Sequence, residues 1–388
     1  MNPNQMKTME KRKFSKVDIV LGLLFGDEGK GRTMDSLFLT NKNMGSSRIC
    51  VRFSGGHQVG HTVMINGVGK HVFSNYGSGT LRGIPTYYSE YCTIYYPTMI
   101  SEGLKLLGSF GIKPIVYVHP LTMIATVYDL AYNRALEYDR GVSKHGSVGV
   151  GFGSTVSRNL NTPYKLYAID AQNSKIFKEK NNAIKSYYDI LLGSSSQFLR
   201  HKYHLILDEL EYDYLDSLNI LPFTIKPYEF LKNYQYLGFE GSQGIMLDET
   251  HGIYPNVTYS STTSKNALEI CRKLGIDDEF INIYYVTRCY TTRHGMGWMP
   301  NKSKIKLINT EEETCKDNKH QGPLRIGKFC YETINHSLMI DDIYSNGIGK
   351  NLVVTCMDQR PKFDLDSGRL NTIFRKIILF NKPYNEKE

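Results

Sequence analysis

The sequence predicts an α/β protein in which one large, mainly parallel central sheet is flanked by helices. Segments that read as strands alternate with segments that read as helices, which favours a parallel sheet covered by helices. Glycine-rich stretches directly follow several apolar runs, as expected where a strand ends in a turn. With 388 residues, of which 41% are hydrophobic and 22% charged, the chain can also bury a substantial core.

The N-terminal third carries clear strand and helix signals. Residues 18–26 (DIVLGLLFG) predict a buried strand that runs into a glycine turn, and residues 29–40 (GKGRTMDSLFLT) predict the helix that follows. Residues 47–56 (SRICVRFSGG) predict a second strand that ends in glycines. Residues 96–111 (YPTMISEGLKLLGSFG) predict another helix, and residues 113–120 (KPIVYVHP) predict the strand after it.

We expect one domain with a flexible N-terminal tail. Residues 1–16 are polar and basic and predict the tail, while residues 17–388 predict the single domain. Within it, residues 159–236 are polar and aromatic with few glycines, which predicts a helical insertion or flank. Two apolar runs, 234–239 and 280–286, each lead into a loop rich in glycine, serine and threonine. Open α/β sheets bind their ligands at such strand ends.

Composition narrows the class of protein. The net charge of +9 is scattered along the chain, so we expect no nucleic-acid partner. Seven cysteines without a CxxC pair predict neither a disulfide framework nor a zinc site, and they favour a reducing, cytoplasmic location. No apolar run approaches the roughly 20 residues that span a bilayer, so we expect no membrane partner.

Residues 22–33 (GLLFGDEGKGRT) have the glycines and the lysine of a phosphate-binding loop. Backbone N–H groups at such a strand-to-helix turn bind phosphate, and the loop lysine reaches the terminal phosphates. Because Gly31 follows Lys30, the hydroxyl that usually binds Mg²⁺ is missing. Asp27 is then the candidate metal ligand or proton acceptor. The alternative is a glycine turn whose acidic pair, Asp27 and Glu28, is simply solvated.

Residues 54–67 (SGGHQVGHTVMING) contain a histidine beside a glycine turn. His61, between Gly60 and Thr62, can act as an acid or stabilise charge. A single histidine is more often structural, so this block alone is weak evidence. The block becomes informative because it follows the phosphate-binding loop by about thirty residues.

Four blocks occur in the order seen in adenylosuccinate synthetases: GDEGKG, GGHQVGHTVMING, FEGSQGIMLDETHGIYPNVTYSSTT and YTTRHGMG. The chain resembles that family from about residue 18 to residue 370. The resemblance implies a cytoplasmic, homodimeric enzyme that folds around one large, mainly parallel sheet. It also implies that the enzyme joins IMP and aspartate using GTP and Mg²⁺.

The resemblance gives the acidic loop a chemical role. It implies that Asp27 removes the N1 proton of the purine, so that O6 attacks the γ-phosphate of the triphosphate. His61 would stabilise the phosphate in transit and Lys30 would neutralise its charge. The amine of aspartate would then displace phosphate from C6. This is sound chemistry, because removal of the N1 proton makes O6 a better nucleophile and phosphorylation then turns a poor leaving group into a good one.

The resemblance also implies four sets of binding residues. The nucleoside triphosphate site comprises Gly26, Glu28, Gly29, Lys30, Gly31, Arg32, Gly60, His61, Thr62, Arg325, Asp358, Ser367 and Gly368. The purine monophosphate site comprises Asp27, Lys30, Gln58, Gly60, His61, Ser147, Arg158, Gln243 and Thr258. The amino acid site is assigned to Arg325 and Arg293, with Lys319 as a further candidate. Asp27 and the carbonyl of Gly60 would hold Mg²⁺.

Several positions depart from the family pattern. Gln58 replaces an asparagine that touches the base and its phosphate. The arginine-rich loop that recognises aspartate is replaced by KHQGPLRIGKF, in which Arg325 is the single arginine. Cys356 replaces the lysine that covers the base of the triphosphate, so we expect ATP or dATP to serve at least as well as GTP. Ser367 follows Asp358 much sooner than in the family.

Three readings of the function stay open at this stage. The first is a ligase acting on IMP or dIMP. Compact relatives in bacteriophages act on dGMP and carry serine where this chain has Asp27, so dGMP is the alternative acceptor. A second reading is a nucleotide switch, but such a protein would not need Asp27 and His61 together. A third is a non-catalytic relative, and the loss of the arginine-rich loop supports it.

Overall fold

The computed structural model describes residues 14–303, 305–308 and 321–387, and its centre is a nine-stranded sheet. In sheet order the strands are β15 (Lys376–Leu379), β14 (Gly349–Thr355), β11 (Ile281–Arg288), β1 (Lys16–Gly22), β10 (Tyr236–Glu240), β2 (Arg48–Arg52), β5 (Thr86–Tyr88), β7 (Val116–Val118) and β9 (Thr224–Ile225). Every neighbouring pair is parallel, which confirms the predicted fold class.

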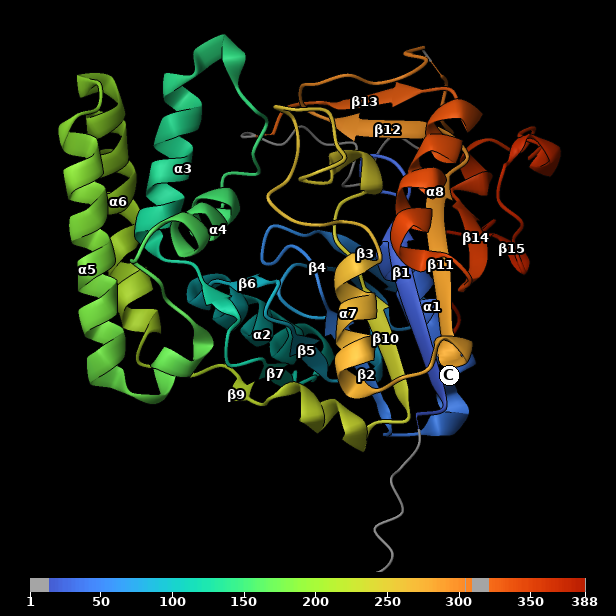
Figure 1. Ribbon diagram of the computed structural model, residues 1–388, viewed down its shortest axis with the longest axis horizontal. Coiled ribbons are helices and arrows are strands. Elements are labelled where there is room, and N and C mark those ends of the chain that lie inside the picture. The colour runs from blue at the N-terminus through green and yellow to red at the C-terminus, as the bar shows by residue number, and fades with distance from the viewer. Residues whose placement is uncertain (1–13, 304, 309–320, 388) are drawn as a thin grey trace, which may run out of the picture.

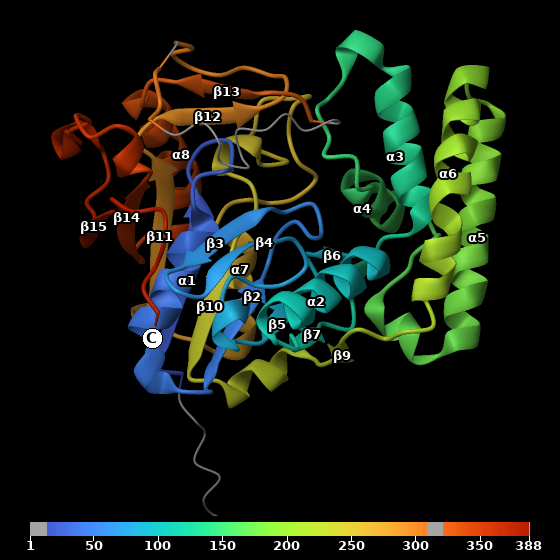
Figure 2. The same cartoon turned by 180° about the vertical axis from the view of Figure 1, so that it is seen from behind.

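Elements pack on both faces of this sheet (Figures 1 and 2). Helix α1 (Lys30–Thr40) and the hairpin of β3 (His61–Ile65) and β4 (Gly69–Phe73) lie on one face. Helices α7 (Lys265–Leu274) and α8 (Tyr331–Ser345) lie on the other. Strand β1 therefore buries successive side chains on opposite faces, which explains why it reads as a continuous apolar run.

A helical lobe stands beside the sheet, on the side away from β14 and β15 (Figure 1). It contains α3 (Val127–Asp139), α4 (Phe152–Asn161), α5 (Ser174–Gly193) and α6 (Gln197–Ser217), while α2 (Tyr96–Phe110) lies beside β5 and β7. Helices α2, α3, α5 and α6 share one hydrophobic core with strands β5 and β7, distinct from the two cores around the central strands. The apolar residues of α4 form a smaller cluster with Met123. Helices α5 and α6 fall within the segment 159–236, which also supplies the edge strand β9.

Short strand pairs complete the fold: β12 (Thr291–His294) with β13 (Leu324–Gly327), and β6 (Thr93–Ile94) with β8 (Met123–Ile124). Of the segment 1–16, residues 1–13 lie outside the described part of the chain, and Lys16 already belongs to β1. No helix among the described residues is long and apolar enough to cross a membrane.

The parallel sheet fixes where the site forms. Since β1, β2, β10, β11 and β14 run in the same direction, their carboxyl ends meet at one edge. The loops that leave this edge carry the motifs singled out in the sequence. They begin at residues 23, 53, 241, 289 and 356.

Candidate active site

A cavity of about 960 Å³, the main pocket, lies at the carboxyl ends of these strands. Its lining brings together most of the residues predicted to bind nucleotides: Gly26, Asp27, Glu28, Gly29, Lys30, Gly31, Arg32, Gln58, Gly60, His61, Thr62, Gln243 and Asp358. Asp27, Gln243 and Cys356 line it with left-handed backbone angles, at φ of 54°, 58° and 58°. Such conformations are costly outside glycine and gather at functional sites.

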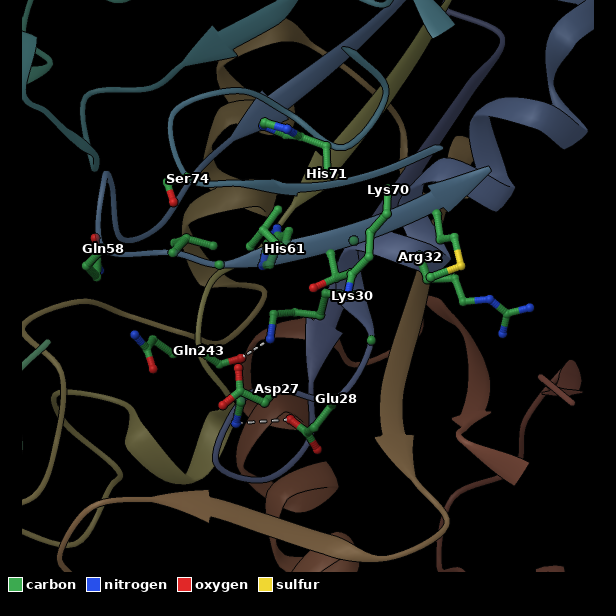
Figure 3. Close-up of a pocket in the computed structure, with 18 of the residues that line it drawn as sticks. Asp27, Glu28, Lys30, Arg32, Gln58, His61, Lys70, His71, Ser74 and Gln243 are labelled. Carbon is green, nitrogen blue, oxygen red and sulfur yellow. Dashed lines mark hydrogen bonds between the residues drawn. The ribbon is translucent and has the colours of Figure 1, made fainter. Parts of the chain in front are cut away.

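The two acidic residues of the phosphate-binding loop point in different directions (Figure 3). The Glu28 carboxylate turns inward and accepts hydrogen bonds from the backbone N–H groups of Leu24, at 2.9 Å, and Gly26, at 3.3 Å. Burial raises the pKa of Glu28 to about 8, against the effect of Lys30. The Asp27 side chain is 31% exposed within the pocket. Glu28 therefore shapes the loop, and Asp27 remains available to a ligand.

The N-terminus of α1 is built to receive an anion. Its N-cap, Gly29, has φ of 95°, and no side chain caps the first turn. The first N–H groups of the helix are thus free of side-chain caps, and the helix dipole favours negative charge there. Lys30 adds a buried amine that donates to the Gln243 carbonyl, and burial lowers its pKa. A Cβ on Gly31 would lie 2.8 Å from the Cβ of His61, so glycine lets β3 approach the loop.

His61 is paired with a buried carboxylate that the sequence analysis did not single out. Its Nδ1 lies 2.9 Å from Oε1 of Glu240, the last residue of β10. Burial raises the pKa of Glu240, but His61, Arg52 and Ser78 together hold it at about 2. Burial lowers the pKa of His61, so we take the imidazole as neutral and Glu240 as ionised. The signal in the sequence was an acid at the end of an apolar strand, in the block FEGSQG.

Asp27 has two partners that the sequence analysis did not single out, His294 and Arg288. Nε2 of His294, at the end of β12, lies 3.3 Å from Asp27 Oδ2. Nδ1 of His294 lies 3.4 Å from the Gly322 carbonyl. Arg288, at the end of β11, donates from Nε to the Asp27 carbonyl. These contacts hold both the backbone and the carboxylate of Asp27.

Several polar atoms at the main pocket are buried without a protein partner among the described residues. They are Gln58 Oε1 and Nε2, Arg32 Nε and Nη1, and both ring nitrogens of His61, since Nδ1 lies 2.9 Å from Glu240 without hydrogen-bond geometry. Folded proteins rarely leave such groups unpaired, because each costs about 1–3 kcal/mol. Their concentration here indicates that a polar ligand completes the site.

A second pocket of about 410 Å³ adjoins the first, since Gln321 lines both. Its charged lining residues are Lys144, Lys302 and Arg325. Arg325 donates to the Met296 carbonyl at 3.0 Å, and its Nε is buried without a partner. Arg325 thus belongs to the second pocket and not to the triphosphate end of the main pocket, which corrects one of its two predicted roles.

Comparison with known proteins identifies the family. The family model described as adenylosuccinate synthetase matches residues 19–360. The chain belongs to the adenylosuccinate synthetase family. Among curated relatives, the adenylosuccinate synthetase of Herminiimonas arsenicoxydans is 30% identical over 297 residues, which is 73% of this chain and 64% of that relative. That of Parabacteroides distasonis is 30% identical over 300 residues, 74% of this chain and 66% of the relative. The chain thus spans about two thirds of the length of these relatives.

Two solved structures share the fold. Fully ligated adenylosuccinate synthetase from Plasmodium falciparum superposes with a TM-score of 0.63 at 21% identity, covering 89% of this chain and 77% of that one. The succinoaminodeoxyadenylate synthetase of cyanophage S-2L, bound to dGMP and dATP, gives a TM-score of 0.64 at 14% identity. The latter match covers 96% of this chain and 94% of the cyanophage chain.

The role that family resemblance implied for Arg158 is wrong in this structure. Arg158 is buried in α4, where Nε and Nη2 donate to the Asp129 carboxylate at 2.8 and 2.9 Å. Nη1 donates to the Tyr164 carbonyl at 2.6 Å, and Nη2 also reaches the Ile124 carbonyl at 3.1 Å. With these donors engaged and outside the lining of the main pocket, Arg158 stabilises the helical lobe.

Arg293, which was predicted to bind the amino acid, lines neither pocket. Its Nε, Nη1 and Nη2 donate to the backbone carbonyls of Met296, Trp298 and Asn256, at 3.0, 2.7 and 3.0 Å. Its guanidinium also lies 4.5 Å from the centre of the Phe25 ring. It therefore holds the loop after β12. The other candidate, Lys319, lies outside the described residues.

Four further predicted ligands lie off the main pocket. The Ser147 hydroxyl donates to Asn133 Oδ1 at 3.0 Å, and its neighbours Val148 and Val150 line the pocket instead. Thr258, Ser367 and Gly368 do not line either pocket, and the last two are exposed. These four residues were assigned by their position relative to family motifs. None of them lines either pocket in the structure.

Proposed function

We propose that this protein is a ligase that joins an amino acid to C6 of a 6-oxopurine nucleoside monophosphate, IMP or dIMP, driven by a nucleoside triphosphate. The observation that carries the proposal is Asp27, a carboxylate directed into the pocket beside Lys30 and the uncapped N-terminus of α1. A simple phosphate-binding site would exclude such a carboxylate. A reaction that starts with proton removal next to a phosphate requires it.

The proposed reaction uses these residues in sequence. Asp27 takes the N1 proton of the purine, and O6 attacks the γ-phosphorus while its bond to the β-phosphate oxygen breaks. Lys30 and the N–H groups of α1 stabilise the phosphoryl group in transit. His61, with Nδ1 toward Glu240, presents Nε2 to the same group. The amine of aspartate then adds at C6 and phosphate leaves, giving the N6-succinyl nucleotide.

The residues present fit a divalent cation that also binds the substrate phosphates. Asp27 offers a carboxylate to the pocket, and Gly60, which would supply a backbone carbonyl, is exposed and lines the same pocket. The described residues contain no cluster of three or more His, Cys, Asp or Glu side chains that would hold a metal alone. Mg²⁺ matches this poor protein ligand set, because it usually takes one or two carboxylates together with phosphate oxygens and water. When bound, Mg²⁺ would neutralise charge on the β- and γ-phosphates.

The second pocket supports a dicarboxylic amino acid such as aspartate. Its three cations, Lys144, Lys302 and Arg325, come from three separate parts of the chain, and Arg325 lies in β13. Gln321 lines this pocket and the main pocket, so an amino acid held there would lie beside the purine. We also propose, from family membership, a homodimer in the cytoplasm, and light scattering would test the first of these.

A second candidate substrate, dGMP, has one observation in its favour. The cyanophage synthetase solved with dGMP and dATP matches this chain over almost the full length of both, which the longer curated relatives do not. Against it, this chain keeps Asp27 where the dGMP-acting relatives carry serine. A 2-amino group should crowd the longer side chain, so IMP or dIMP remains the first choice.

One experiment separates these readings. The enzyme is mixed with aspartate, Mg²⁺ and IMP, dIMP, GMP or dGMP, each with GTP, ATP or dATP. Phosphate release and product mass are then followed over a single turnover. We expect succinylated IMP or dIMP to form fastest. Faster succinylated dGMP would establish the second candidate, and no phosphate release with any combination would indicate a non-catalytic relative.

A further inference from the structure

The main pocket and the second pocket share a dividing wall, formed by residues 294–296 and 321–322. His294 is the last residue of β12 and lines the main pocket. The two residues that follow it, Gly295 and Met296, line the second pocket. Opposite them, Gln321 lines both pockets and Gly322 lines the second. A change on one side of this wall can therefore reach the other side.

The His294 side chain touches both sides of the dividing wall. Only 9% of this side chain is exposed. Its Nε2 lies 3.3 Å from Oδ2 of Asp27, in the main pocket. Its Nδ1 lies 3.4 Å from the carbonyl oxygen of Gly322, which lines the second pocket. One imidazole ring thus connects the proposed general base to the proposed amino acid site.

The Asp27 carboxylate depends on side-chain contacts for its direction. Arg288 donates to the Asp27 carbonyl and so holds the backbone, which has a left-handed φ of 54°. The backbone contact alone does not fix where the carboxylate points. A reacting group that is misplaced by about 1 Å can lose about a hundredfold in rate. The contact with His294 is therefore in a position to affect how well Asp27 meets the purine.

The second pocket acts on the same wall through Arg325. Its Nη2 donates to the carbonyl of Met296, two residues after His294. The two sides of the wall are also in close contact, since a Cβ on Gly295 would lie 2.3 Å from the carbonyl oxygen of Gln321. A carboxylate that binds Arg325 engages the guanidinium that holds this turn. Packed and hydrogen-bonded groups of this kind can carry coupling between two sites.

We propose that His294 is a positioning residue that couples the two pockets. An amino acid in the second pocket fixes the dividing wall, and His294 then holds the Asp27 carboxylate toward N1 of the purine. The inference rests on the proposed function, because it takes the second pocket as the amino acid site. The coupling has a chemical use, since a purine phosphorylated before the amine arrives is open to hydrolysis. Binding energy of the correct substrate then helps to assemble the catalytic site.

Calorimetry without a triphosphate measures this coupling in the absence of turnover. The Kd of IMP is determined with and without saturating L-aspartate for the parent, His294→Val and His294→Gln. We expect aspartate to tighten IMP binding by about five- to tenfold in the parent, an ordinary size for coupling between sites, and by less than twofold in His294→Val. His294→Gln keeps a polar group at a similar reach and should retain most of the effect. His336→Val, which changes an exposed histidine on α8, is the matched control and should behave like the parent.

Three results would overturn the proposal. The first is an IMP affinity in the parent that aspartate does not change, and the second is equal coupling in the parent and His294→Val. The third is the same loss in His294→Gln as in His294→Val, which would assign the effect to packing of the ring. A parent that shows the coupling but forms no succinylated nucleotide would refute the proposed function alone. An enzyme that aminates IMP while His294→Val keeps the coupling would refute this inference alone.

Discussion

The main pocket and the second pocket meet at Gln321, yet they are built differently. In the main pocket the proposed catalytic groups have close partners, as Asp27 has His294 and His61 has Glu240. In the second pocket the charged groups Lys144, Lys302 and Arg325 come from separate parts of the chain. The proposed chemistry is thus preorganised, whereas the proposed amino acid site depends on how distant segments come together.

The largest effect that we expect follows removal of the Asp27 carboxylate, which tests whether the main pocket carries out the chemistry. Asp27→Asn keeps the size of the side chain but cannot take the N1 proton. We expect turnover to fall by about 10²–10⁴-fold, as is typical when a general base is lost. Monophosphate binding, measured by calorimetry, should persist. Turnover within a few-fold of the parent would remove Asp27 from the mechanism.

The next largest effect concerns stability. Arg158→Met leaves the Asp129 carboxylate buried without its partner, which typically costs about 3–5 kcal/mol. Urea unfolding should show this loss, while the KM for the monophosphate in the folded fraction stays near the parent value. A large rise in that KM with unchanged stability would restore Arg158 as a phosphate ligand.

Glu240→Gln tests the partner of His61. With its pKa held at about 2, Glu240 is ionised in the folded state at a pH where the unfolded carboxyl is already protonated. Its contribution to stability is therefore present above about pH 4.5 and is lost as pH falls toward 2. We expect Glu240→Gln to be less stable than the parent at pH 7 and the gap to narrow at pH 3. A gap that widens on acidification would contradict the ionised state.

Arg325→Ala examines the second pocket. We expect the KM for aspartate to rise by about tenfold with kcat little changed, because a half-buried cation that binds a carboxylate equally in the ground and transition states contributes a uniform binding energy. Arg293→Lys, which lies outside the pocket, should act through stability instead. If Arg325→Ala leaves the KM for aspartate unchanged, the amino acid binds elsewhere.

The same contrast separates what the sequence predicts from what it does not. The sheet and the phosphate-binding loop follow from local patterns, since apolar runs and adjacent glycines fix strands and turns over a few residues. Asp27, Lys30 and His61 meet because parallel strands end at one edge. Arg158 and Ser147 were misassigned because their surroundings depend on long-range packing, which a motif does not specify. Lys382 and Pro383 line the main pocket but were not predicted to do so. No local pattern in the sequence indicates that the C-terminal segment returns to the site.

The smallest expected effect is on the choice of triphosphate, and it concerns the base end of the main pocket. Cys356, in a left-handed turn with φ of 58°, stands where the family has a lysine over the base. Asp358, which could accept from guanine, already accepts at Oδ2 from Gln359 Nε2 at 2.8 Å. We therefore expect ATP or dATP to support the reaction at least comparably to GTP.

Competition between labelled triphosphates would measure this preference directly. A hundredfold preference for GTP, worth about 2.7 kcal/mol, would show that Asp358 still reads guanine without the lysine. Asp358→Asn is the matched variant, because it removes the acceptor for guanine N1 and N2 hydrogens and leaves adenine contacts unchanged. If preference is already weak, this variant should lower GTP use by only a few-fold and leave ATP use as it was.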